Sequence, residues 1–388
     1  MLKSDYPDVM DSPAYIVYED RMRRNLALIT RVAAEAGVDI IMAFKANALW
    51  RTFDIVREYV KDSTASSLNE LRLGREFLGG NVHSYCPAYT DDTISEFVEG
   101  SSHITFNSPS QYMRFKSVLD RHNATSSHHV SPGLRVNPHC SVIDTDIYNP
   151  ALPGSRFGVS AEALGDSLPE GIEGLHFHAL CESSSRDLEK VLAAFEKSFG
   201  KYLPYVKWVN MGGGHLMTRE GYDTGHLVEL LRGFRSRYPW LKVILEPGSA
   251  FMWRTGDLRA TVVDVVCNDG INPAIIDASF ACHMPDCLEM PYKPAISESL
   301  GLELVSGKPT YRIGGNSCLS GDFIGEWSFD RPLNAGDILT FEDMNHYTNV
   351  KTTMFNGIQH PSVWLEKSDG SQHLLRRYTY DDYKSRMS

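Results

Sequence analysis

Short apolar runs recur along the first two thirds of the chain, each followed by a polar turn and then an amphipathic stretch. We expect these runs to be strands, because they have strand length and end at turn residues. They cover residues 39–44, 63–66, 83–86, 103–106, 133–136, 175–178, 208–211 and 243–245. The first four follow one another at intervals of about twenty residues, as βα units require.

Helical patterns fill several of the gaps between these runs, at residues 68–78, 187–199 and 227–238. Strands that alternate with helices in eight successive units predict an α/β fold, a closed parallel (β/α)8 barrel over residues 36–255. A doubly wound parallel sheet is the competing architecture, but it rarely needs eight such units. The longest gap, residues 137–174, is rich in proline and glycine and is predicted to be a loop.

The pattern changes after residue 248. Runs at residues 258–267, 274–278, 310–313 and 337–341 predict strands linked by turns, with little helix between them. We therefore expect a second, mostly antiparallel β domain made of residues 256–388 together with the N-terminal segment, residues 1–35.

The composition excludes several classes of protein. The 388 residues are 42% hydrophobic and 22% charged, and no apolar run is long enough to cross a bilayer. The net charge of -11 disfavours nucleic acid and anionic membranes, and is compatible with a cationic substrate. Seven scattered cysteines form no Cys-x-x-Cys pair, and the polar N-terminus lacks the pattern of a secretory signal. We expect a cytoplasmic protein.

Polar residues stand where the predicted strands end, the edge of a β/α barrel at which chemistry gathers. Lys45 follows the first strand, His178 ends the sixth, Gly212, Gly213 and Gly214 follow the seventh, and Glu246 follows the eighth. A partly desolvated lysine has a lowered pKa and attacks carbonyl carbons. The alternative for Lys45 is a strand-end side chain that reaches out to water.

The other strand-end residues carry similar pairs of interpretations. Three glycines leave backbone N–H groups uncovered and suit a phosphate, although glycine turns are common in βα loops. Glu246 would keep a pyridine nitrogen protonated, or is simply a solvated acid before a turn. His176 and His178 point to one face of their strand, as a metal pair or as a ring-stacking histidine beside a structural neighbour.

A thiol lies in a glycine-rich loop of the second domain. Cys318 would donate a proton there, or would be a small buried hydrophobic residue. A zinc-dependent barrel hydrolase is a rival hypothesis, with His176, His178, Cys282 and His283 as ligands. No carboxylate at a sensible spacing completes such a site, so our expectation for a bound metal is none.

Several separate motifs occur in an order that resembles one enzyme family. They are Ala43-Phe44-Lys45-Ala46, Phe177-His178, Gly212-Gly213-Gly214, Glu246-Pro247-Gly248, Cys318…Asp322 and Phe341-Glu342-Asp343…Tyr347-Thr348…Phe355-Asn356-Gly357. This order is similar to that of the fold type III (alanine racemase-like) pyridoxal-phosphate decarboxylases of ornithine, diaminopimelate and arginine. Within them the chain most resembles the carboxynorspermidine (carboxyspermidine) decarboxylases of polyamine biosynthesis.

The resemblance implies a role for each motif residue. It implies pyridoxal 5'-phosphate as cofactor and Lys45 as its Schiff-base lysine. The remaining cofactor contacts would come from His178, from Gly212, Gly213 and Gly214, from Glu246 and from Tyr347. It also implies a homodimer with shared active sites, in which Cys318 protonates the α-carbon in the neighbouring subunit.

The resemblance also narrows the substrate to a small-molecule polyamine. Glu246, Asp286, Glu289 and Asp322 are the predicted substrate-binding acids. In the ornithine enzymes an aspartate directly follows the thiol, whereas here Leu319 follows Cys318, which argues against ornithine. Ornithine, arginine and diaminopimelate decarboxylases, a racemase and a non-catalytic relative are the alternatives. Carboxynorspermidine and carboxyspermidine differ by one methylene, worth only about 1–3 kcal/mol, so the sequence does not separate them.

Overall fold

The computed structural model of the protein describes residues 10–143 and 145–388. The N-terminal residues on which the expected lack of a secretory signal rests lie outside this part. The chain divides into two compact units. One holds Arg23–Phe251, and the other holds Met252–Ser388 with the described residues before Arg23.

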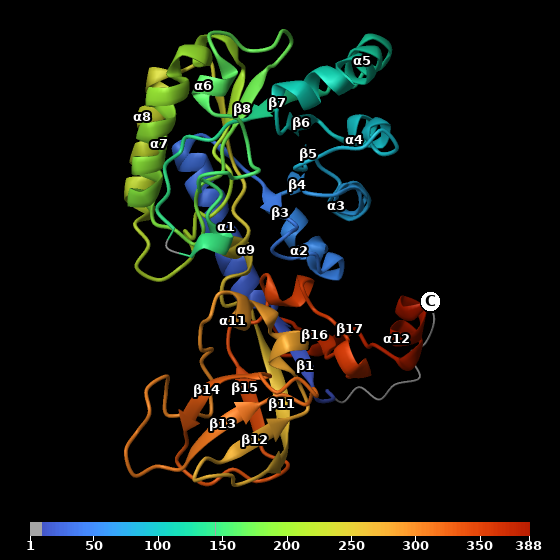
Figure 1. Ribbon diagram of the computed structural model, residues 1–388, viewed down its shortest axis with the longest axis vertical. Coiled ribbons are helices and arrows are strands. Elements are labelled where there is room, and N and C mark those ends of the chain that lie inside the picture. Colours follow the sequence, from blue (N-terminus) through green and yellow to red (C-terminus); the bar gives the residue numbers. More distant parts are fainter. Residues whose placement is uncertain (1–9, 144) are drawn as a thin grey trace. The chain divides into compact units, whose positions relative to one another are not determined.

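The first unit is a parallel β/α barrel, which confirms the predicted fold (Figure 1). Every predicted barrel strand is present. They are β2 (Asp39–Ile40), β3 (Met42–Ala43), β4 (Ser63–Ala65), β5 (Val82–Tyr85), β6 (His103–Phe106), β7 (Ser131–Arg135), β8 (Gly174–His176), β9 (Trp208–Asn210) and β10 (Lys242–Leu245).

The first barrel strand bonds to a neighbour on each side, and this closes the sheet. It is divided at Ile41 into β2, which pairs with β10, and β3, which pairs with β4. The Ile41 amide donates to Leu245 O at 2.9 Å, and the next amide, that of Met42, donates to Asp62 O at 3.1 Å. One strand of five residues therefore joins the two ends of the series from β4 to β10.

Helices surround the barrel strands, with α7 and α8 on one side in Figure 1 and α3, α4 and α5 on the other. The helices of this part are α1 (Glu19–Ala36), α2 (Phe53–Arg57), α3 (Leu68–Leu73), α4 (Ile94–Gly100), α5 (Pro109–Thr125), α6 (Ala161–Leu164), α7 (Ser185–Phe199), α8 (Thr224–Arg237) and α9 (Ser249–Met252). A π-helical turn, Gly74–Leu78, continues α3.

Helix α7 illustrates why the predicted boundaries move by a residue or two. The apolar pattern predicts a start at residue 187, but the helix begins at Ser185 because Ser184 caps it. The Ser184 hydroxyl accepts the Asp187 amide, and the Asp187 carboxylate accepts the Ser184 amide. This reciprocal capping box satisfies two amides that would otherwise lack partners at the helix start.

Most of α1 belongs with the barrel in the structural division, whereas the sequence-based division placed residues 1–35 with the C-terminal unit. The end of α1 is tied to α8. The Arg232 side chain donates to Glu35 O at 2.7 Å, and Arg235 donates to Ala36 O at 3.2 Å. A long helix with one apolar face gives no sign in the sequence of which unit that face will contact.

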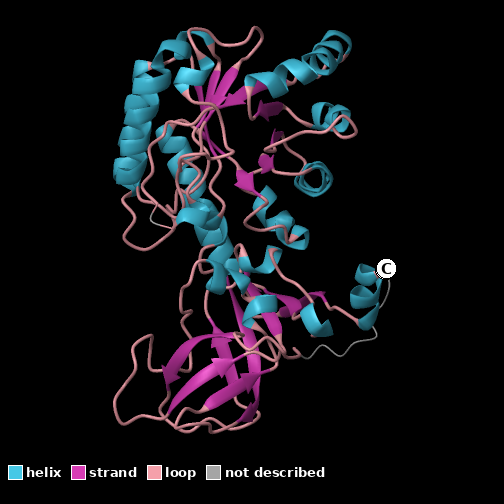
Figure 2. Ribbon diagram, in the orientation of Figure 1, coloured by secondary structure: helices cyan, strands magenta, loops and turns pink. Residues whose placement is uncertain are grey.

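The second unit is a mostly antiparallel sheet, as predicted, with little helix (Figure 2). Its central strand β11 pairs with β1, β12 and β15. The strands are β1 (Ala14–Tyr18), β11 (Gly256–Val265), β12 (Pro273–Ile276), β13 (Thr310–Gly314), β14 (Phe323–Ser328), β15 (Ile338–Phe341), β16 (Ser362–Glu366) and β17 (Gln372–Arg376). The helices are α10 (Phe280–His283), α11 (Pro285–Glu289) and α12 (Tyr380–Met387).

One indole ring fills a layer of the interior near the amino-terminal ends of the barrel strands. Gly133, Gly174 and Trp208 pair in register across β7, β8 and β9, so they form one layer. A Cβ added at Gly133 would lie 2.2 Å from the Trp208 ring, and one added at Gly174 would lie 2.0 Å from it. The indole N–H donates to Ser131 Oγ at 2.8 Å, which fixes the ring in place. The two glycines are therefore required for space.

We predict that Gly174→Ala destabilises the protein by at least about 1–3 kcal/mol, because overpacking a rigid core displaces the ring or the backbone. Gly200→Ala is the matched control: a Cβ there meets nothing within 4 Å, and φ of −55° suits alanine. The control should change stability by less than about 1 kcal/mol. Urea unfolding of both variants measures the difference, and equal midpoints would contradict the proposed packing.

Candidate active site at the carboxyl ends of the barrel strands

A cavity of about 330 Å³ opens among the carboxyl ends of the barrel strands. Lys45, His178 and Glu246, which the sequence singled out at separate strand ends, all line it. Arg135 and His176 line it as well. The strand-end prediction therefore brought together residues that the fold places around one cavity.

Lys45 follows β3 and is partly buried at the cavity wall. Burial lowers the pKa of Lys45 below its usual value; Glu246 acts in the opposite direction, and Arg135 lowers the pKa further. The lowered pKa increases the fraction of unprotonated amine near neutral pH, the form that attacks carbonyl carbons.

Glu246 follows β10 and is 8% exposed. Burial raises the pKa of Glu246, and a hydrogen bond from Asn210 and the nearby Lys45 ammonium oppose that rise. The Asn210 amide donates to Glu246 Oε1 at 2.6 Å. This carboxylate is therefore held by a buried polar partner, and is not the solvated surface acid that the sequence left open.

His178 has a fixed ring orientation. Its Nδ1 accepts the Gly213 amide at 2.8 Å, so the ring is positioned by the glycine loop after β9. Burial, followed by Lys45 and Arg135, holds the pKa of His178 well below its ordinary value. A neutral, fixed imidazole at the cavity wall suits contact with a flat ring more than with an anion.

Close backbone packing requires glycine at this loop, and two of its three N–H groups have partners inside the chain. The Gly212 amide donates to Asn210 Oδ1 at 2.8 Å and the Gly213 amide to His178, so these two N–H groups have partners inside the chain. A Cβ at Gly213 would lie 2.5 Å from Glu246 O, and one at Gly214 would lie 2.4 Å from the Leu180 backbone. A phosphate contact from this loop stays a prediction.

Arg135, the last residue of β7, was not predicted. It is 4% exposed, lines the cavity and donates to His178 O at 3.2 Å. Its guanidinium lies 4.5 Å from the centroid of the Tyr85 ring. Burial lowers the pKa of Arg135 from its usual value. The position of Arg135 at the end of a predicted strand could have identified it. It was missed because the neighbouring residues of that run are apolar.

His176 shares the cavity, but no metal set surrounds it. Both ring nitrogens of His176 are buried and lack a hydrogen-bond partner within the described chain. Its Nε2 lies 3.8 Å from Glu246 Oε2, and its ring meets Tyr85 edge-on. Across residues 10–143 and 145–388, no three His, Cys, Asp or Glu side chains gather as metal ligands. The rival zinc site therefore has no ligand set in this part of the chain.

In the C-terminal unit, the thiol loop lies between β13 and β14. Cys318 is exposed, and its amide donates to Asn356 Oδ1 at 2.9 Å. Asp322, predicted to bind a substrate amine, is only 3% exposed. Its carboxylate accepts the Ala281 amide and both the amide and hydroxyl of Ser317. These bonds give Asp322 a structural role in the loop, and its role toward a substrate stays a prediction.

The acids of α11 surround a cation from their own unit. Lys351 Nζ lies 2.6 Å from Asp286 Oδ1 and 2.6 Å from Glu289 Oε2. The same ammonium lies 5.7 Å from the centroid of the Tyr347 ring. The pair of acids is therefore already suited to a primary ammonium.

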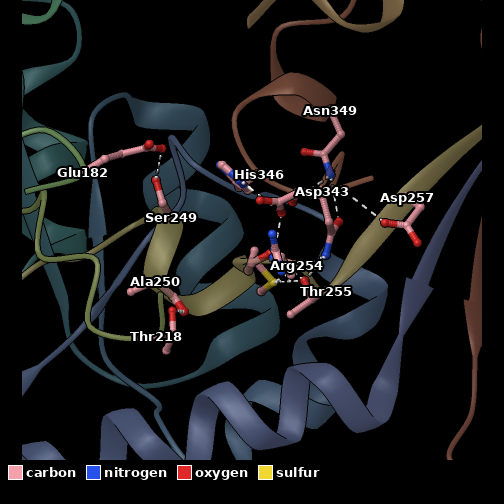
Figure 3. A network of polar contacts seen from close by, with 12 residues as sticks. Glu182, Thr218, Ser249, Ala250, Arg254, Thr255, Asp257, Asp343, His346 and Asn349 are labelled. Carbon is pink, nitrogen blue, oxygen red and sulfur yellow. Dashed lines mark hydrogen bonds and ion pairs between the residues drawn. The ribbon is translucent and has the colours of Figure 1, made fainter. Parts of the chain in front are cut away.

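Polar contacts hold the segment that carries Tyr347 to the start of β11 (Figure 3). The Asp343 carboxylate accepts the Arg254 amide at 2.6 Å, and the Asp343 amide donates to Asp257 Oδ1 at 3.0 Å. Asn345 donates to Thr255 Oγ1 at 2.8 Å. Tyr347 has a positive φ of 47°, a constrained backbone that these contacts support.

Comparison with known proteins agrees with this geometry. The family model described as "Pyridoxal-dependent decarboxylase, C-terminal sheet domain" matches residues 15–345. A carboxyaminopropylagmatine decarboxylase of Synechocystis is 44% identical over 97% of this chain and 96% of its own length. A carboxynorspermidine/carboxyspermidine decarboxylase of Campylobacter jejuni is 39% identical over 97% of this chain and 98% of its own.

Solved structures extend the comparison. The carboxynorspermidine decarboxylase of Campylobacter jejuni, solved with norspermidine, has a TM-score of 0.88 and 38% identity over 97% of this chain and all of that chain. A diaminopimelate decarboxylase from Helicobacter pylori shares the fold, with a TM-score of 0.77 and 17% identity. The match covers 98% of this chain and 97% of that chain. With a family model over most of its length and relatives this similar end to end, the chain belongs to the pyridoxal-dependent decarboxylases.

Proposed function

We propose that this chain removes the carboxyl group of carboxynorspermidine or carboxyspermidine to give norspermidine or spermidine. The observation that carries the proposal is the set of Lys45, His178 and Glu246 around one cavity in a chain of this family. Two relatives at 35% and 39% identity over nearly their whole length are named for these substrates.

The cavity residues fit pyridoxal phosphate, the cofactor of the family. The Arg135 guanidinium in the cavity wall suits an anionic ligand, and the lowered pKa of Lys45 favours the unprotonated amine that a carbonyl group needs. The buried His176 nitrogens, which have no partner in the described chain, suit a polar ligand. The cofactor would be held by Lys45, His178, the Gly212–Gly214 loop and Glu246. The contact from Tyr347 that the family resemblance implies stays a prediction.

When bound, this cofactor supplies a ring that accepts the electron pair left behind as the carboxylate departs. The Lys45 amine would hold the cofactor through its carbonyl carbon, because the lowered pKa favours the unprotonated amine that attacks carbonyl groups. An ionised Glu246 carboxylate would favour a proton on the ring nitrogen of the cofactor, and His178, whose orientation the Gly213 amide fixes, would contact the ring. The Cys318 thiol donates the proton that replaces carbon dioxide on the α-carbon.

A second substrate of the same type is carboxyaminopropylagmatine, because the relative with 44% identity is named for it. It shares the carboxylated aminopropyl group, but its far end is a guanidinium instead of an ammonium. We propose that Asp286 and Glu289 meet this distal cation, since the ammonium of Lys351 already lies 2.6 Å from an oxygen of each. Lys351 would then have to move aside when the substrate binds.

We further propose a homodimer in which Cys318 serves the neighbouring subunit. The thiol is exposed, and apolar side chains on the same loop and nearby are exposed as well: Leu319 by 46%, Phe323 by 38% and Phe355 by 51%. Exposed apolar groups around a reactive thiol suit a surface that a second copy covers. All seven cysteines are free, which supports a reducing compartment such as the cytoplasm.

Lys45→Ala should abolish turnover, with a loss of roughly 10³-fold or more, because no amine remains to hold the cofactor. It should also remove the visible absorbance of covalently bound pyridoxal phosphate. Lys197→Ala changes an exposed lysine on α7 and should leave both properties unchanged. Carbon dioxide release and absorbance spectra measure the two effects, and a Lys45→Ala enzyme that keeps both would refute the assignment.

The substrate proposal predicts a ranking. Carboxynorspermidine, carboxyspermidine and carboxyaminopropylagmatine should each exceed ornithine, arginine and diaminopimelate in kcat/KM by about 100-fold or more, because only they fill a site built for a longer polycation. Parallel assays of carbon dioxide release give the ranking directly. A preference for ornithine or diaminopimelate would overturn the polyamine assignment while leaving the decarboxylase family intact.

The dimer proposal predicts complementation between two defective chains. Mixed subunits of Lys45→Ala and Cys318→Ala contain one complete site in each hybrid dimer, so random mixing should restore about a quarter of the wild-type rate. The two parent variants are the controls, and Cys318→Ala alone should be slowed in product formation. Activity of the mixture no higher than the average of the parents would show that the thiol does not serve a neighbouring subunit.

A further inference from the structure

Asn210, the last residue of β9, connects two parts of the site that the reaction uses. It is 2% exposed, and its amide group donates to Glu246 Oε1 at 2.6 Å. Its carbonyl oxygen accepts the Gly212 amide at 2.8 Å. One buried side chain therefore joins the carboxylate after β10 to the glycine loop after β9.

The Gly212 amide decides which way the Asn210 side chain points. An N–H group must face the amide oxygen, so the NH2 group of Asn210 is the end that faces Glu246. This matters because a carboxylate accepts hydrogen bonds only when it meets a donor. The loop backbone thus makes Asn210 a donor toward Glu246.

The other groups that face Glu246 come from four different strands or the residues that follow them. Lys45 after β3 and Arg135 of β7 act on its carboxylate through their charges, and Thr64 of β4 adds a side-chain hydrogen bond. His176 of β8 lies 3.8 Å away through its Nε2. Lys45 and His176 are also groups that a bound ligand would engage. Asn210 has both ends of its amide committed inside the chain.

We propose that Asn210 is a positioning residue that aims the carboxylate of Glu246 and keeps it ionised. The hydrogen bond of 2.6 Å compensates part of the cost of burying a charge, a cost that otherwise drives a carboxyl group to keep its proton. This proposal rests on the role proposed above for Glu246 in the reaction, but its effect on the Glu246 carboxylate exists without any cofactor.

Asn210→Asp is the diagnostic substitution because it preserves size and still accepts the Gly212 amide. It replaces the donor that faces Glu246 with a second carboxylate, and two carboxylates in contact cannot both ionise readily. Burial already raises the pKa of Glu246 above its ordinary value, and this change would raise a pKa of the pair further. When the pKa of a carboxyl group is higher in the folded state than in the unfolded state, the protein becomes less stable as the pH rises toward that folded-state pKa.

The first test uses the enzyme without cofactor. Thermal unfolding is measured at about pH 5.5 and about pH 8. The Tm of Asn210→Asp should be below that of wild type at both pH values, and the difference should be larger at pH 8 by about 2 °C or more. Asn123→Asp is the control, since the half-buried Asn123 amide also donates to and accepts from one backbone residue, Val130. Its deficit should be equal at both pH values. A deficit of Asn210→Asp that does not change with pH would overturn the proposal.

The second test exchanges the Asn210 amide and the Glu246 carboxylate between the two positions. Asn210→Asp with Glu246→Gln again pairs one carboxylate with one amide, so the pH dependence of unfolding should return to that of wild type. Activity should stay low, because the charge now lies on residue 210. Asn210→Asp alone should lower kcat by roughly 10–100-fold, with a smaller change in KM, and weaken binding of pyridoxal phosphate.

The two proposals fail in different ways. A Glu246→Gln enzyme with full activity would refute the catalytic role of Glu246, whatever the unfolding experiments show. If Glu246→Gln is inactive but the double variant unfolds with the same pH dependence as Asn210→Asp alone, Asn210 does not control this carboxylate. If the Asn210→Asp enzyme keeps the kcat of wild type, Asn210 likewise does not control the Glu246 carboxylate.

Discussion

The arrangement of the candidate site depends on the pairing of the first barrel strand with a neighbour on each of its two sides. Because residues 39–43 bond to β10 on one side and to β4 on the other, the sheet closes and its first and last strands become neighbours. Lys45 and Glu246, about two hundred positions apart in the sequence, are thereby brought to the same cavity. The closure of a backbone sheet, and not any local motif, places the amine within electrostatic reach of the carboxylate.

Burial controls the protonation of the ionisable groups at this cavity. Lys45, Arg135 and Glu246 are all partly or fully removed from water, and burial is the first cause of the shift in each pKa. Two histidines beside them, His176 and His178, have pKa values held well below the ordinary range and remain neutral. The cavity wall thus carries the Arg135 guanidinium, the Glu246 carboxylate and the Lys45 amine, whose pKa is lowered. In a chain of net charge -11, the guanidinium is the charged group at this cavity that suits an anionic ligand.

Most of the barrel was predictable because parallel strands buried on both faces are continuous apolar runs. The residues at the ends of four strands were predictable for the same reason, since the fold directs them to one place. Arg135 and Asn210 were missed although they also end strands, because each lies in a run read as apolar, and hydrogen-bond partners have no periodicity in sequence. Strands β1, β14, β16 and β17 were not predicted. Only β1 pairs across the length of the chain, with β16, whereas β14 and β17 pair with the strand that precedes each of them.

The two ends of the barrel differ in what fills them: large neutral rings at one end, and charged side chains around a cavity at the other. At the amino-terminal ends, Trp208 fills the layer that Gly133 and Gly174 leave open, and His83 stacks on His103 with 3.9 Å between ring centroids. Burial keeps the pKa values of these two histidines low, so that end is filled by uncharged side chains. At the other end, glycines permit backbones to approach closely while charged side chains line the space that remains. Large neutral rings therefore occupy one end of the barrel, and the cavity lies at the other.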